Sequence, residues 1–169
     1  KMNIFYLDAD PKIAAQQQCD KHVVKMILET AQLLSTAHRE LDGDDNADAN
    51  ELYKATHKNH PSAVWARDNS ENYDWLWQHM DALLKEYTAR YHKTHKTERL
   101  LHHLWEHPKN ITHGDFTPPP QCMPDQYKSD CTVSAYRDYY LGEKMDIAKW
   151  AHSESPTWVL SKATWSHVK

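Results

Sequence analysis

The stretch from Asp10 to Leu41 reads DPKIAAQQQCDKHVVKMILETAQLLSTAHREL, and it decides the fold class of this chain. Asp10 is a favourable N-cap residue, and Pro11 suits the first position of a helix. Apolar residues then recur at steps of three and four, the period of an amphipathic helix. They are Ile13, Val23, Val24, Ile27, Ala31, Leu34, Ala37 and Leu41. The pattern predicts a long first helix, or two helices that meet near Cys19 and Asp20.

Outside this stretch, the apolar spacing and the helix-start residues again favour helices. We expect them to begin at Pro61 (with Asn59 or His60 as the cap), after Ser70 as the cap of a helix over 71–93, at Thr97, and at about Asp130 with a break at Gly142. Residues 3–7 are expected as a small strand or an extended lead-in. Residues 42–50 are expected as an acidic surface loop, and 108–128 as a proline-rich extended connection. The sequence therefore predicts an all-α fold: a single compact helical domain over residues 1–169.

Composition limits the class of protein. A chain of 169 residues with 40% hydrophobic and 26% charged residues has the size and balance of one globular domain. Three glycines are too few for glycine-rich phosphate loops or a many-turned β fold. No apolar run approaches the roughly 18 residues of a membrane span. Three cysteines without CxxC spacing, and no signal peptide after Met2, lead us to expect a reduced cytoplasmic protein without membrane contact. Lys1 is expected to be an addition before the natural start at Met2.

The net charge of −4 argues at first against a nucleic-acid partner, but the charge is uneven. Residues 40–51 hold six acidic residues and no Lys or Arg. Residues 85–109 are rich in bases, and these are Lys85, Arg90, Lys93, Lys96, Arg99 and Lys109. Such a cluster indicates either a local basic face or an ordinary solvated helix surface.

The first candidate site lies on the long helix. Helical spacing places Lys21, Lys25 and Glu29 on one stripe, with His22 beside it. Two neighbouring lysines lower each other's pKa, so one amine could act as a nucleophile while Glu29 or Asp20 moves protons. The simpler interpretation is an i,i+4 ion pair between Lys25 and Glu29.

The second candidate is a dense run of hydrogen-bond donors beside the helix that Pro61 opens. A helix N-terminus with His and Asn side chains can bind phosphate. The residues in question are His57, Asn59, His60, Arg67, Asn72 and Tyr73. Helix capping with a structural histidine is the alternative.

Two further patterns suggest base stacking and metal binding. Arg137 and Tyr139 could stack on bases, because aromatic rings and guanidinium groups both do so. The run from His103 to His107 matches the H-x-x-E-H zinc motif. A chance match is easy in a chain with 13 histidines, so we expect no metal and no other cofactor.

Four motifs carry a resemblance to a known family. They are Asn59-His60-Pro61, Asn72-Tyr73-x-Trp75-Leu76, Glu86-Tyr87-x-x-Arg90-Tyr91 and the tail Pro156-Thr157-Trp158. With the long charged first helix, they make about two thirds of the chain resemble phage proteins related to the pyrimidine dimer DNA glycosylases of the endonuclease V type.

The resemblance implies an all-α enzyme that binds damaged duplex DNA without metal. In such enzymes a base leaves the stack, an amine attacks the sugar C1′, and the resulting imine allows strand cleavage. A carboxylate on the first helix assists. This DNA-repair glycosylase, with or without AP-lyase activity, would use Glu29 or Asp20 as proton carrier. His57, Asn59, His60 and Arg67 would contact the DNA.

One departure concerns the amine. The family uses the α-amino group exposed by removal of the initiator Met, and here the following residue, Asn3, is too large for efficient removal. The amine is therefore that of Met2, or Lys21, or Lys25, or the activity is not a lyase.

Three other functions fit the same sequence. The acidic total charge favours an enzyme or binding protein for free nucleotides or nucleotide signals. The acidic segment 40–51 could instead let a phage protein bind a basic host factor. The third alternative is a metal hydrolase that uses the histidine motif.

Overall fold

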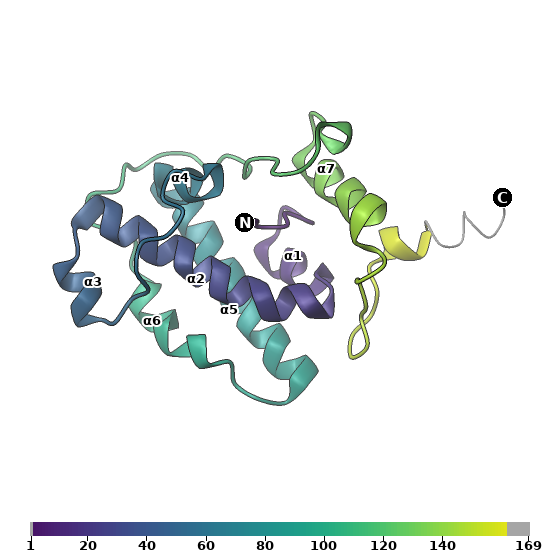
Figure 1. Cartoon of the computed structure of the whole chain (residues 1–169), viewed down its shortest axis with the longest axis horizontal. Helices are drawn as coiled ribbons and strands as arrows, with labels where there is room; N and C mark the ends of the chain where they lie inside the picture. Colours follow the sequence, from purple (N-terminus) through teal and green to yellow (C-terminus); the bar gives the residue numbers. More distant parts are fainter. Residues whose placement is uncertain (1, 162–169) are drawn as a thin grey trace.

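The computed structural model describes residues 2–161, and within them the regular structure is entirely helical (Figure 1). The all-α prediction is confirmed. The α-helices are α1 (Pro11–Gln17), α2 (Asp20–Asp42), α3 (Asp45–Ala49), α4 (Pro61–Asp68), α5 (Ser70–Tyr91), α6 (Leu101–Leu104) and α7 (Thr132–Tyr139). The shorter helical turns are η1 (Lys96–Leu100), η2 (Asp125–Tyr127) and η3 (Tyr140–Lys144). Lys1 and residues 162–169 lie outside this description.

The long helical stretch consists of two helices that meet near Cys19 and Asp20, as the sequence predicted. The side chain of Asp10 accepts hydrogen bonds from the backbone N–H groups of Lys12 and Ile13, and α1 follows. Gln18 and Cys19 have extended backbones, with ψ of 141° and 162°, so α2 has to start afresh after them. Residues 3–7 form an irregular lead-in rather than a strand, with a turn at Phe5, whose φ is +57°.

Helices α2 and α5 pack together at the centre, and α1 and α4 lie along them. Val23, Ile27 and Leu34 of α2 are fully buried in this core. Val24, which the sequence placed in the core, is 37% exposed. The prediction for Val24 was wrong because an adjacent residue is turned by about 100° around the helix axis, which carries it off the buried stripe.

The acidic segment contains a helix that the loop prediction missed. Gly43 ends α2 with φ of +82°, a conformation that glycine adopts without strain. The buried guanidinium of Arg39 then binds Asp44 at 2.9 Å and Asp48 at 2.8 Å, one on each side of the start of α3. This ion pairing gives order to a polar sequence that has no apolar periodicity.

The caps at the starts of α4 and α5 are polar side chains, and the cap of α5 differs from the predicted one. His60 Nδ1 accepts the backbone N–H of Ser62 and so caps α4. The cap of α5 is Asn69, whose side chain accepts the N–H of Asn72, and Ser70 is already the first helical residue. The sequence offered two adjacent capping residues, and the longer Asn side chain reaches the required N–H.

The C-terminal helical segment is shorter than the sequence predicted. After α7, the backbone widens into the π-turn η3, which ends at Lys144 rather than continuing to Trp150. A Cβ at Gly142 would lie 2.4 Å from the ring of Tyr127, so only glycine fits there. The expected extended connection over 108–128 is interrupted only by the single turn η2. None of the helices described within residues 2–161 is long and apolar enough to cross a membrane.

Candidate active site

The carboxylate of Glu29 lies where α2 meets the N-terminal lead-in. Its residue is 8% exposed, and the backbone N–H of Asn3 donates to the carboxylate. The ammonium of Lys25 lies 3.7 Å from Oε2, whereas Oε1 is buried and has no hydrogen-bond partner. Burial raises the pKa of Glu29, and the nearby charge of Lys25 opposes the rise. A carboxyl group so placed can hold a proton nearer to neutral pH than an ordinary Glu, and one of its buried oxygens is unpaired within the protein.

A chain of contacts joins Glu29 to the Asn-His-Pro segment. The side-chain amide of Asn3 donates to the carbonyl of Cys122 at 3.1 Å, and Cys122 Sγ lies 3.6 Å from Ser62 Oγ. Ser62 is in turn bound to His60, the cap of α4. These contacts link the N-terminal lead-in, which meets Glu29, to the N-terminus of α4.

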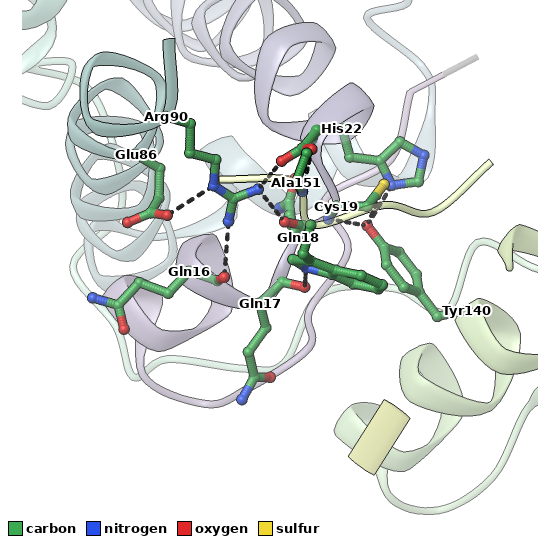
Figure 2. Close-up of polar contacts among 11 residues, drawn as sticks. Gln16, Gln17, Gln18, Cys19, His22, Glu86, Arg90, Tyr140 and Ala151 are labelled. Carbon is green, nitrogen blue, oxygen red and sulfur yellow. Dashed lines mark hydrogen bonds and ion pairs between the residues drawn. The ribbon is translucent and has the colours of Figure 1, made fainter. Parts of the chain in front are cut away.

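His22 packs on the lead-in, with its ring stacked on that of Phe5 at 4.2 Å between ring centroids. Figure 2 shows its Nδ1 against the hydroxyl of Tyr140, which also accepts the backbone N–H of Cys19 at 3.2 Å. Burial, together with the smaller effects of the charges of Lys144 and Lys25, lowers the pKa of His22 to about 4. The ring is therefore neutral at pH 7 and cannot supply a positive charge to the site.

Asp20 is the first residue of α2, and its carboxylate binds groups other than those around Glu29. Its Oδ1 lies 3.1 Å from Arg90 Nη1, and its Oδ2 accepts the backbone N–H of Ala151 at 2.8 Å. Figure 2 shows Arg90 reaching from α5 to the α1–α2 junction. Asp20 and Glu29 are nine positions apart in the sequence, which is about 13.5 Å along the helix. The two carboxylates therefore lie too far apart to act on the same atom, and of the two only Glu29 remains a candidate proton carrier.

Among the other predicted site residues, the exposed ones are Lys21, Lys25, His57 and Asn59. His57 has φ of +48°, and its Nδ1 is 2.8 Å from Thr56 Oγ1. Arg67 is half-buried, with Nη1 enclosed and unpaired. These positions can still face DNA.

Asn72 and Tyr73 are fully buried and are used inside the protein. Asn72 donates to the carbonyl of Trp65, and its own carbonyl accepts the N–H of Thr117. The hydroxyl of Tyr73 donates to the carbonyl of Leu104. Neither side chain reaches the surface of the protein, so we do not include Asn72 or Tyr73 among the candidate DNA contacts.

Arg137 and Tyr139 hold the lead-in against α7. Arg137 donates to the carbonyl of Leu7 at 2.9 Å and contacts Asp8 at 3.3 Å. The ring of Tyr139 stacks on Phe5 and has the ammonium of Lys144 4.9 Å from its centroid. Their role in the structure is to position the N-terminal segment, and base stacking by them stays a prediction.

Three residues near this site were not singled out from the sequence: Asn3 as a partner of Glu29, then Ser62 and Cys122. They reach the site through contacts distant along the chain, for which the sequence holds no spacing signal. Within residues 2–161 no group of three His, Cys, Asp or Glu side chains is placed to hold a metal ion, so the described structure gives the histidine motif no third ligand. His107 instead pairs with Asp74 at 3.3 Å.

A helical fold with a buried first-helix carboxylate against the N-terminal backbone suits a DNA-repair glycosylase. The family model for pyrimidine dimer DNA glycosylase matches residues 2–99, more than half of the chain. The chain therefore belongs to the pyrimidine dimer DNA glycosylase family, and DNA is its class of substrate. No curated protein and no solved structure matches the chain. The matched residues include Asn3, Lys25, Glu29 and His60, whereas Tyr140 and Lys144 lie beyond them.

The buried histidines predict a pH dependence of stability. His79 is fully buried, with Nδ1 2.9 Å from the carbonyl of Pro11 and Nε2 3.0 Å from the Gln18 amide; burial lowers its pKa to about 4, as it does for His22. In the unfolded chain both rings gain a proton near pH 6.5, so the stability that these two neutral rings contribute is complete above that pH and is lost as the pH drops toward 4. Each ring accounts for about 3 kcal/mol of this loss.

Urea unfolding at several pH values would test this expectation. His79→Gln is expected to flatten the fall between pH 6.5 and 4, whereas replacement of the exposed His92 should leave it unchanged. A pH profile of wild-type stability that is flat over this range would contradict the prediction.

Proposed function

We propose that this protein removes damaged pyrimidines from duplex DNA and then nicks the strand through an imine intermediate. The observation that supports the proposal best is Glu29, buried against the backbone N–H of Asn3 with one oxygen free and Lys25 beside it. The N-terminal backbone and a proton-carrying carboxyl thus lie together, which is the pairing that amine catalysis at C1′ requires.

The chemistry follows from that pairing. The lone pair of a neutral amine attacks C1′, and the bond from C1′ to the damaged base breaks, its electrons leaving with the base. Opening of the sugar ring gives an imine, and loss of a C2′ proton then expels the 3′ phosphate by β-elimination. Glu29 can give a proton to the departing group and accept one later, because its raised pKa lets both forms occur near working pH.

For the amine we favour the α-amino group of Met2 in a chain that begins there. Asn3 is held on Glu29, and Met2 is its direct neighbour. Lys25 also lies at Glu29, and we assign it to the electrostatic stabilisation of the carboxylate and of the DNA phosphates. Lys21 lies one turn further back on α2 and is exposed.

The proposal is tested by nicking of irradiated and unirradiated duplex DNA at low salt, with borohydride trapping of the imine. We expect nicking of irradiated DNA only, and a trapped adduct that acetylation of the Met2 amine abolishes while Lys21→Ala and Lys25→Ala retain it. An adduct that survives acetylation but is lost in Lys25→Ala would move the amine to Lys25.

Absence of both binding and nicking at low salt, where phosphate contacts are strongest, would contradict the proposal as a whole. The free-nucleotide alternative rests on the net charge of −4. It would then be tested by thermal stabilisation with small nucleotides.

A further inference from the structure

Trp105, which follows α6, is the most exposed large apolar residue within residues 2–161, with 63% of its surface accessible. The other tryptophans that the structure describes each donate their indole N–H to a protein oxygen, and they are Trp65, Trp75, Trp77, Trp150 and Trp158. Among the same described residues, the Trp105 indole has no acceptor for its N–H and no aromatic ring or cation against it. Tryptophan is enriched among the side chains that dominate binding at protein interfaces.

Trp105 borders two hollows, and a third continues from them. One hollow is lined by Asp42, from the end of α2, and by Glu106. The second has a volume of about 410 Å³ and is lined by Glu106 and by Asp74 of α5. Asp74 also lines the third, together with Glu71. Because neighbouring hollows share lining residues, we treat the three together as the Trp105 groove.

The Trp105 groove is negatively charged at neutral pH. Its described lining holds one ammonium group, that of Lys109, against the carboxylates of Asp42, Glu71, Asp74 and Glu106. Burial would raise the pKa of Asp42, but hydrogen bonds from Lys109 and Asn110 outweigh burial and lower it, so this carboxylate stays ionised. Burial lowers the pKa of His38, which is therefore neutral. The other histidines of the lining add positive charge only when they are protonated.

We propose that the Trp105 groove binds an arginine- or lysine-bearing segment of a partner protein. A cation over an aromatic ring is attracted by the negative face of the ring, and the indole of Trp binds it best. Glu106 and Asp74, on either side of the second hollow, attract further basic residues of the segment. The unpaired indole N–H is a donor for its backbone. The same carboxylates repel phosphates, so the charges favour a basic protein segment over DNA.

This surface is separate from the candidate active site. Asp42 lies 13 positions after Glu29 on α2, which is about 20 Å along the helix. Figure 1 shows α6 and α7 on opposite sides of the α2–α5 pair, and α7 is the helix that packs on the N-terminal lead-in. A basic partner bound at Trp105 would therefore leave the region around Glu29 open to DNA.

The test uses two labelled nonapeptides, one with arginine and glycine in alternation and one in which neutral citrulline replaces each arginine. We expect the arginine peptide to bind wild-type protein at low salt and the citrulline peptide to bind at least about tenfold more weakly. Trp105→Ala should weaken binding of the arginine peptide by about fivefold, the usual size of an exposed cation–π contact, and Trp105→Phe should restore most of it. Glu106→Gln should weaken binding by about twofold.

NMR of the wild-type protein gives a second readout, which does not depend on how well Trp105→Ala folds. The indole N–H signal that disappears in Trp105→Phe should shift when the arginine peptide is added, and the other indole signals should not. Val64→Ala is the matched control, because Val64 is an exposed apolar residue on α4, and it should bind the peptide as wild type does.

Unchanged affinity in Trp105→Ala, or equal binding of the citrulline peptide, would overturn the proposal. A single-stranded oligothymidylate that shifts the Trp105 signal and binds more tightly than the arginine peptide would assign the groove to nucleic acid instead. A wild-type dimer in sedimentation that Trp105→Ala dissociates would assign it to a second copy of this chain. None of these results would bear on the glycosylase proposal, which is tested by nicking of irradiated DNA.

Discussion

Replacing Glu29 with Gln is expected to lower base excision by about 10²–10⁴-fold, the usual contribution of a positioned proton carrier. The amide has the same shape and can still accept the N–H of Asn3, so the N-terminal segment should stay in place. It cannot give or take a proton at the sugar. Single-turnover cleavage of irradiated duplex measures the effect, and a variant that retains more than a tenth of wild-type activity would contradict the assignment.

The same substitution is expected to raise stability at neutral pH. Burial raises the folded-state pKa of Glu29, so the folded protein holds this proton at pH values where the unfolded chain has released it. Wild-type stability from this group is therefore complete below about pH 4.5 and falls as the pH rises through the folded pKa. Glu29→Gln removes that loss.

Its melting temperature should exceed that of wild type at pH 7 and match it at pH 4. Glu40→Gln, an exposed change on the same helix, should alter neither stability nor activity. If Glu29→Gln loses activity and gains stability, Glu29 acts in the reaction and is not needed for folding.

Local rules predicted the parts of this fold that local chemistry determines. Asp10-Pro11 marked the start of α1, Pro61 marked α4, and the Lys25–Glu29 pair followed from i,i+4 spacing. Each depends on residues within one or two helical turns, where geometry is fixed by the backbone.

The remainder of the site depends on contacts between distant residues. Nothing in the spacing of Asn3 connects it to Glu29 or to Cys122, and only packing of the lead-in between α2 and α7 brings them together (Figure 1). Arg90 was expected on a basic surface face and is instead 1% exposed. A charge count cannot detect this burial, since a cation becomes internal when enough acceptors surround it.

Arg90→Met is expected to cost the protein about 3–5 kcal/mol of unfolding free energy, the usual result of removing one partner from a buried ionic cluster. The guanidinium donates to the carbonyls of Gln16 and Gln18, and contacts the carboxylates of Asp20 and Glu86 (Figure 2). Without it, two carbonyls and two carboxylates lose their common donor. Urea unfolding measures the loss, and Arg99→Ala, at an exposed arginine, should stay within about 0.5 kcal/mol of wild type.

The loss should extend to the C-terminal segment. Asp20, which Arg90 holds, also accepts the N–H of Ala151, and its own N–H donates to the carbonyl of Lys149 at 2.8 Å. Hydrogen exchange at Ala151 should therefore speed up in Arg90→Met. Arg90→Lys should recover only part of the stability, because one ammonium cannot reach acceptors spread around a planar fork. Wild-type stability in Arg90→Lys would show that the charge at this position is sufficient. Unchanged hydrogen exchange at Ala151 in Arg90→Met would show that the C-terminal segment does not depend on this cluster.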